Sequence, residues 1–262
     1  MSNSHGVLPE APAPASSRLT PASPKRLARI AGVFYLLVGI TGGFAAGFMD
    51  PFLYVAGDAA ATAGNVTENP TLVRIGVVSH LVDAVFFLLT AVTLYLLLKH
   101  AGKHAGRLMV LAVIVAAGII SVSAVFTYVA LQVTTNGSYT DAFGLLGSNA
   151  LVLLLLDIQH YGILAAQVFF GLWLAPLGYL VIKSKLFPRA LGFILILATA
   201  SYLVDVALAF LFPALATQIH SYLGIVPAIA EIWMVLYLLI IGVRTPRVAG
   251  RLPAQVTPAP AW

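Results

Sequence analysis

The segment LVRIGVVSHLVDAVFFLLTAVTLYLLL, residues 72–98, is almost uninterrupted in its apolar character. As a helix rising 1.5 Å per residue, it is long enough to cross about 30 Å of hydrocarbon. Five further apolar segments have comparable length, at residues 28–48, 107–133, 158–182, 190–212 and 222–243. None has the alternation of a membrane β-barrel, and lipid offers no partner to an unpaired backbone group. The sequence therefore predicts an all-α, polytopic integral membrane protein with six transmembrane helices.

The composition of the whole chain leads to the same class. Of the 262 residues, 60% are hydrophobic and only 9% are charged, against about 25% charged in ordinary soluble domains. A soluble fold could not hide so much apolar surface. Cysteine is absent, which excludes disulfides, thiolate metal sites, iron–sulfur clusters and a cysteine nucleophile.

Lysine and arginine are distributed unequally about the six spans. Thirteen of the 14 fall on one side of a six-span arrangement, and Arg74 alone falls on the other. The positive-inside rule then places both termini in the cytoplasm and makes residues 49–70, 134–150 and 213–221 the outer loops. The net charge of +5 is accounted for by orientation and by contact with membrane lipids, so no nucleic-acid partner is expected.

The chain divides into three regions. Residues 1–24 are rich in Pro and Ala, and residues 244–262 contain Pro and Arg. Neither stretch has apolar periodicity, and both are interpreted as disordered tails. Residues 25–243 form the six-span transmembrane domain.

Two local patterns carry structural predictions. In the first outer loop, Asp58 is expected to cap the N-terminus of a short helix at residues 59–63. Gly39, Gly43 and Gly47 are spaced four apart in the first span. This small-residue spacing predicts close contact with another helix.

Ionisable residues within the spans are the main functional signal. A charge at bilayer depth costs at least about 2.5–3.5 kcal/mol on insertion scales, so such residues should face the bundle interior or a wet cavity. The candidates for ligand or proton binding lie in four of the spans: His80, Asp83, Asp157, His160, Asp205 and Glu231. The first and third spans contain none, and both are predicted to be packing helices.

Counting along each helix from the cytoplasmic basic residues gives the depth of these groups. Asp83, Asp205 and Glu231 come out about 20–24 Å above that side, at 1.5 Å per residue. We therefore expect these three carboxylates to converge, with His80 or His160 on the outer edge of the cluster. Uncompensated carboxylates at one depth must be protonated, spread apart or neutralised by something bound.

Further chemistry of these groups follows from depth and spacing. Arg74 and Asp157 have similar depth and are predicted to pair as ions. The spacings H-x-x-D at 80–83 and D-x-x-H at 157–160 put each pair on one helix face. Two histidines with carboxylates suit zinc, manganese or iron, so the sequence allows a bound metal ion but does not identify it. No other cofactor is predicted, since the chain has no Walker loop, dinucleotide-binding turn, haem or flavin signature.

Several short motifs resemble a known family. They are RLARIAG at 26–32, GDAAATA at 57–63, LDIQHYG at 156–162, VFFGL at 168–172, FPRALG at 187–192, YLVD at 202–205 and PAIAE at 227–231. With these motifs the chain resembles the bacterial multi-pass membrane proteins known as domain of unknown function family 4386, from about Lys25 to Arg244. The resemblance implies a multi-pass protein of the bacterial cytoplasmic (inner) membrane, and it brings no activity or catalytic residue.

Three functional hypotheses follow. The leading one is a non-enzymatic membrane protein with an outward-facing polar pocket, which binds or transports a proton, a metal cation or a small cationic solute. One alternative is a membrane-embedded, metal-dependent lipid hydrolase that uses His80, His160 and the carboxylates. The other is a structural or partner-binding membrane protein without a ligand. No catalytic residue and no oligomeric state are assigned.

Overall fold

The computed structural model describes residues 23–244, which fold as helices with short connections and contain no strand. Six helical segments are long and apolar enough to cross a membrane, which confirms the predicted all-α, multi-pass fold. The first comprises α1 (Pro24–Phe44), the π-helical turn η1 (Ala45–Met49) and α2 (Asp50–Leu53). The others are α4 (Pro70–Leu98), α5 (Lys103–Thr135), α6 (Gly137–Ser184), α7 (Arg189–Leu211) and α8 (Pro213–Ile240). Of the predicted tails, all but Ser23, Pro24 and Arg244 lie outside the described residues.

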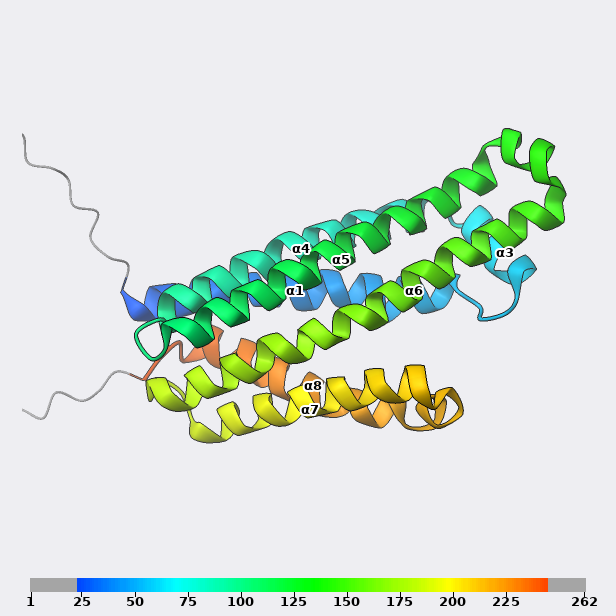
Figure 1. The fold of residues 1–262 in the computed structure, drawn as a ribbon. Helices are drawn as coiled ribbons and strands as arrows, with labels where there is room; N and C mark the ends of the chain where they lie inside the picture. Colours follow the sequence, from blue (N-terminus) through cyan, green and yellow to red (C-terminus); the bar gives the residue numbers. More distant parts are fainter. Residues whose placement is uncertain (1–22, 245–262) are drawn as a thin grey trace, which may run out of the picture.

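The spans are arranged as a ring (Figure 1). Along the chain α1 packs against α4, and each later span packs against the next, until α8 returns to contact α1. The contact between α1 and α8 is the least extensive in this ring. Both ends of the described chain lie at the same end of the bundle (Figure 1), where the Arg244 amide donates to the Leu186 carbonyl at 2.9 Å.

The basic residues mark one end of the bundle. Every described Lys and Arg except Arg74 lies at or near the helix ends on the side of the two chain ends. This is the distribution on which the positive-inside argument rests. The assignment of that side to the cytoplasm stays a prediction.

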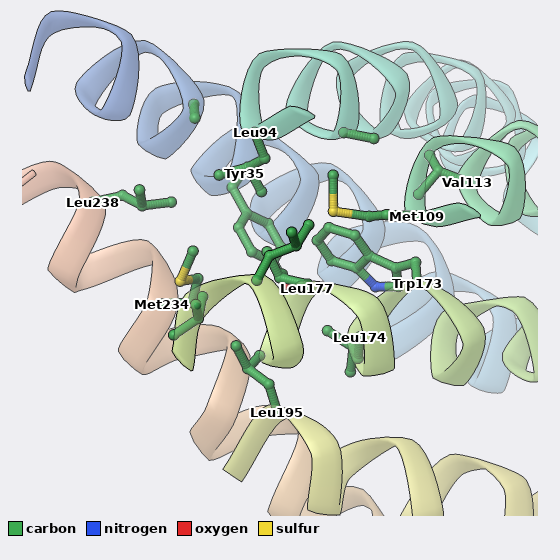
Figure 2. Packing of buried hydrophobic residues seen from close by; sticks show 14 of the residues in the cluster. Tyr35, Leu94, Met109, Val113, Trp173, Leu174, Leu177, Leu195, Met234 and Leu238 are labelled. Atoms are coloured by element: carbon green, nitrogen blue, oxygen red, sulfur yellow. The ribbon is translucent and has the colours of Figure 1, made fainter. Parts of the chain in front are cut away.

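A cluster of buried apolar and aromatic side chains holds the spans together (Figure 2). The Trp173 ring lies edge-on to Tyr35 and to Phe87, with centroids 5.4 and 5.1 Å away, so α6, α1 and α4 meet at one indole. Small residues bring α6 and α7 close together: a Cβ added to Gly178 would lie 2.6 Å from the carbonyl oxygen of Gly192. In lipid such packing replaces the hydrophobic driving force between helices.

Helix extends further on the outer side than the sequence predicts. The predicted outer loop at 134–150 is mostly helical, because Asn136 caps α6 by accepting from the Ser138 amide at 3.1 Å. Gly144, at φ 67° and ψ 172°, is not helical, so two helical segments meet at a kink there. The predicted loop at 213–221 is also helical, since Pro213 begins α8 with a backbone suited to the first turn.

The two local predictions have opposite outcomes. The Asp58 cap is confirmed: its Oδ1 accepts from the Ala61 amide at 2.9 Å and begins α3 (Ala59–Glu68). The predicted close contact at Gly39, Gly43 and Gly47 is wrong within the described chain, because no atom lies within 4 Å of a Cβ built at any of them.

Candidate functional site

A cavity of about 240 Å³, here called the inner cavity, lies at the centre of the ring. All six spans contribute to its wall. The first span lines the cavity with five residues, so the prediction that it only packs is wrong, whereas α5 contributes the apolar Ile120, as a packing helix can. Its polar lining is His80 and Asp83 of α4, Tyr202 of α7 and Glu231 of α8. The first span contributes small residues, and α4 and α6 contribute aromatic rings: Gly39, Gly42, Gly43, Ala46, Phe87, Phe170 and Trp173.

Asp83 has an unusual environment in this cavity. The residue is 7% exposed, and its Oδ1 is buried without a hydrogen-bond partner among the described residues. Gly42 leaves the room that the carboxyl group occupies, since a Cβ built there would lie 3.0 Å from Asp83 Oδ1. Buried polar atoms in native proteins nearly always have a partner, and one left without costs about 1–3 kcal/mol.

Glu231 is held by two tyrosines. Tyr35 donates its hydroxyl to Oε2 at 2.7 Å, and Tyr202 donates to Oε1 at 3.0 Å. Both carboxyl oxygens therefore have a donor, unlike those of Asp83. Both tyrosine rings pack on aromatic residues of the cavity lining: Tyr35 contacts Trp173 edge-on, and the ring centroids of Tyr202 and Phe170 are 6.0 Å apart.

A second cavity of about 370 Å³, here called the outer cavity, lies towards the outer end of the bundle. Its lining includes the polar residues Asp50, Tyr54, Gln159, His160, Gln167 and His220. Ala46 and Ile163 line both cavities, so the two spaces are separated by little more than one layer of side chains.

A hydrogen-bonded group stands between the two cavities. Nε2 of His80 lies 3.1 Å from Oδ2 of Asp50, and Gln159 donates its amide to the same oxygen at 2.7 Å. His80 is 2% exposed and lines the inner cavity, whereas Asp50 and Gln159 line the outer one. This group joins the first span, α4 and α6 at the boundary between the two spaces.

Asp157 has a different partner from the one predicted. Tyr54, in the connection after α2, donates its hydroxyl to Oδ1 of Asp157 at 2.6 Å and stacks on His160 with ring centroids 5.0 Å apart. Burial raises the pKa of the Tyr54 hydroxyl well above its usual value, and the hydrogen bond to Asp157 adds to this, so Tyr54 stays a donor. Arg74 is exposed and forms no ion pair within residues 23–244, because equal depth does not place two side chains on facing sides of their helices.

Asp205 is also placed apart from the other two carboxylates. Its Oδ2 lies 2.8 Å from Nδ1 of His220, a pair that joins α7 to the outer part of α8. Tyr202, one turn earlier on α7, lines the inner cavity in its place. Of the three carboxylates expected to converge, Asp83 and Glu231 thus share a cavity and Asp205 does not line it.

The predicted histidine and carboxylate residues are not gathered as metal ligands. Within residues 23–244, no three His, Asp or Glu side chains are grouped closely enough to hold a metal ion. His80 turns to Asp50 and His160 to Tyr54, so the two histidines belong to different contacts.

Sequence reasoning missed Asp50, Tyr35 and Gln159. Asp50 was assigned to the outer loop because the apolar run ends at residue 48, whereas the π-helical turn η1 and α2 continue the first span to Leu53. Tyr35 and Gln159 carry no charge and so escaped a search for ionisable groups. Depth counting does not identify them either, because Tyr35 comes out about 9 Å above Arg29 and Gln159 about 36 Å above Lys183 at 1.5 Å per residue. The one signal for Gln159 is its place directly before His160.

The comparisons with known proteins agree with the fold. No curated protein and no solved structure matches the chain. A family model described as Domain of unknown function (DUF4386) matches residues 30–242, which confirms the resemblance seen in the motifs. Since that match covers most of the chain, the protein belongs to this family.

Proposed function

We propose that this protein of the bacterial cytoplasmic membrane binds a small cation in its inner cavity and transports it, with access from the outer side. The observation that carries the proposal is the buried Oδ1 of Asp83, which has no partner in the described chain and belongs to a residue of the cavity wall. A carboxylate oxygen only accepts hydrogen bonds or coordinates cations. A bound cation therefore offsets the cost of leaving this atom unpaired.

The charges around the cavity support a cationic ligand. Among residues 23–244, no Lys or Arg lines either cavity, so no fixed positive side chain of this part of the chain neutralises Asp83 or Glu231. His80 is the one basic group that the described residues supply to the inner lining, and its Nε2 is already directed at Asp50. The inner cavity thus presents two carboxyl groups to whatever occupies it.

The outer cavity supplies a route from the aqueous side. Its lining includes His220, whose side chain is 60% exposed, and it adjoins the inner cavity at Ala46 and Ile163. The contact among His80, Asp50 and Gln159 stands where a cation would pass from one cavity to the other. A polar passage that is closed by breakable hydrogen bonds suits a transporter better than a protein with a purely structural role.

The two alternative functions fit less well. A metal-dependent hydrolase needs several His, Asp or Glu ligands around one ion, and residues 23–244 gather no such group. A purely structural role gives no reason for a carboxyl group that is buried beside a cavity with an oxygen that has no hydrogen-bond partner within residues 23–244.

Occupancy can be followed through Trp173, which is 1% exposed and lines the inner cavity. The full chain, with Trp233→Phe and Trp262→Phe so that one tryptophan remains, is placed in lipid nanodiscs and titrated with tetramethylammonium chloride. We expect a saturable change in Trp173 fluorescence and a loss of affinity of about tenfold or more in Asp83→Asn. Asp58→Asn is the matched control, since Asn also caps helices, and it should bind as the parent does. Equal affinity in Asp83→Asn and the parent, or no fluorescence change in either, would overturn the proposal.

A further inference from the structure

The ring of spans is closed between α1 and α8 in its inner half only. There a Cβ built at Gly32 would lie 2.9 Å from the Cβ of Leu238, and Tyr35 hydrogen bonds to Glu231. Further out the two helices separate (Figure 1), and a Cβ built at Gly39 or Gly43 would meet no atom within 4 Å.

Pro227 explains why α8 parts from α1 at this level. It lies one turn before Glu231 and has no amide hydrogen, so the carbonyl of Leu223 has no donor from the helix backbone. Ser201 of α7 supplies one, with Oγ donating to that carbonyl at 2.6 Å. A proline in a helix allows a bend, and here the bond to Ser201 holds the outer part of α8 to α7 and away from α1.

The opening between the two helices leads from lipid to the inner cavity. Gly39 and Gly43 are exposed and line that cavity, so the opening is the cavity's side wall. Elsewhere on the two helices, Ile40 of α1 and Ile225 and Ile229 of α8 are exposed, as expected of surface in contact with hydrocarbon. A row of glycines alone would indicate only that another helix could pack closely there. Behind this one lies Asp83, more than nine-tenths buried and with an unpaired oxygen.

We propose that the cation is an amphiphilic ammonium ion. Its head lies between Asp83 and Glu231, and its apolar tail passes between α1 and α8 into the lipid. This inference rests on the proposed function and names its ligand class.

The aromatic lining favours an organic ammonium over a metal ion. Phe87, Phe170 and Trp173 face the cavity, and aromatic faces attract ammonium groups, by about 2 kcal/mol or more where water is excluded. The carboxyl groups supply the opposite charge. A space of about 240 Å³ accommodates a compact head but not a long alkyl chain. The tail therefore needs the lateral opening, which Gly39 and Gly43 line from α1.

The test compares three compounds in nanodiscs of digalactosyldiacylglycerol, a lipid with neither charge nor ammonium group. They are tetramethylammonium, dodecyltrimethylammonium and the uncharged dodecyl maltoside, each followed by Trp173 fluorescence in the single-tryptophan protein. We expect dodecyltrimethylammonium to bind at least about tenfold more tightly than tetramethylammonium, and the maltoside not to bind. Asp83→Asn should lose both cations.

Two leucine variants separate lateral access from a general effect on the fold. Gly224 of α8 lies seven residues before Glu231, on the same helix face, and has no atom within 4 Å of a built Cβ. Gly224→Leu should remove the preference for the dodecyl compound and leave tetramethylammonium binding unchanged. Gly118→Leu, at an exposed glycine of α5 with equal space, is the control and should change neither. Melting temperatures of both variants show whether the fold is kept, and Gly39→Leu is the second blocking variant if Gly224→Leu unfolds.

Each other outcome is decisive. The lateral opening is not used, and this inference fails, if the dodecyl compound binds no better than tetramethylammonium or if Gly224→Leu keeps the preference. In either case, Asp83-dependent binding of tetramethylammonium still supports the proposed function. If cross-linking shows that the glycine face is covered by a second copy of the chain, the inference fails as well. If no compound binds in an Asp83-dependent manner, both proposals fail together.

Discussion

Tyr35→Phe removes the hydroxyl that donates to Glu231, a residue of the inner cavity wall, and leaves the ring that packs on Trp173. That hydroxyl is 2.7 Å from Glu231 Oε2, and Tyr35 is 2% exposed, so the substitution removes a hydrogen bond made at a buried position and leaves Oε2 without this donor. A hydrogen bond to a charged group contributes about 1.5–3 kcal/mol. We therefore expect Tyr35→Phe to lower the free energy of unfolding by about 1.5–3 kcal/mol.

Two other tyrosines calibrate this value. Tyr202→Phe removes the longer bond to the same carboxyl group, 3.0 Å, from a less buried residue, so its effect should be smaller, about 1 kcal/mol. Tyr237 is 6% exposed, and its hydroxyl makes no hydrogen bond within residues 23–244. Tyr237→Phe should therefore change stability by less than about 0.5 kcal/mol.

The assay is equilibrium unfolding in mixed micelles titrated with dodecyl sulfate, followed by helical circular dichroism. A double-mutant cycle with Glu231→Leu, which removes the acceptor at similar volume, isolates the pairwise contribution. In that background Tyr35→Phe should cost less than about 0.5 kcal/mol, because the hydroxyl no longer has its acceptor. An equal cost in both backgrounds, or a cost no larger than that of Tyr237→Phe, would refute the assignment of Tyr35 as the donor that holds Glu231.

Three further predictions concern packing and topology. Ser201→Ala removes the donor for the Leu223 carbonyl, which Pro227 leaves without a backbone partner, and should lower the free energy of unfolding by about 1–2 kcal/mol in the same assay. Ser121→Ala is the control: it removes a bond to a carbonyl within a regular helix and should lower the free energy of unfolding by less than about 0.5 kcal/mol. Gly178→Ala should destabilise by about 2 kcal/mol or more, because the added Cβ meets the backbone of α7, and a melting temperature equal to that of the parent would contradict this contact. The chain has no cysteine, so Asn65→Cys should react with an impermeant maleimide in intact cells and Lys103→Cys should not; the reverse result would invert the topology.

The number of spans and the side on which basic residues gather could be predicted from the sequence, because hydropathy and the cost of charge in lipid act residue by residue. The helix ends could not. Residues 137–150 and 213–221 are helical although they were assigned to loops, since apolar length reports how much chain lies in hydrocarbon and does not report where hydrogen bonding stops. Capping by Asn136 and the start at Pro213 were visible in the sequence and would have corrected both boundaries.

The candidate site was predicted in part, for a geometric reason. Counting residues gives the height of a side chain in the membrane but not its direction around the helix axis. Asp83 and Asp205 have the same predicted height, yet one faces the inner cavity and the other reaches His220. The same limit applies to glycines. Gly178 packs against α7, whereas Gly39 and Gly43 line an opening because α1 diverges from α8 at their level. The spacing of glycines in the sequence does not distinguish these two situations.

Asp50 shows how an irregular turn can build a site that periodicity does not reveal. A regular helix pattern ends the first span at the apolar limit, and the carboxylate then belongs to a loop exposed to water. The π-helical turn η1 instead carries the span onward, so that Asp50 meets His80 and Gln159 at the boundary between the two cavities. Such turns are rare and are frequently found at functional sites. Asp50 and Asp83 therefore lie on opposite sides of His80 along the proposed route, one in each cavity, so a cation leaving the outer cavity passes from one carboxylate to the next.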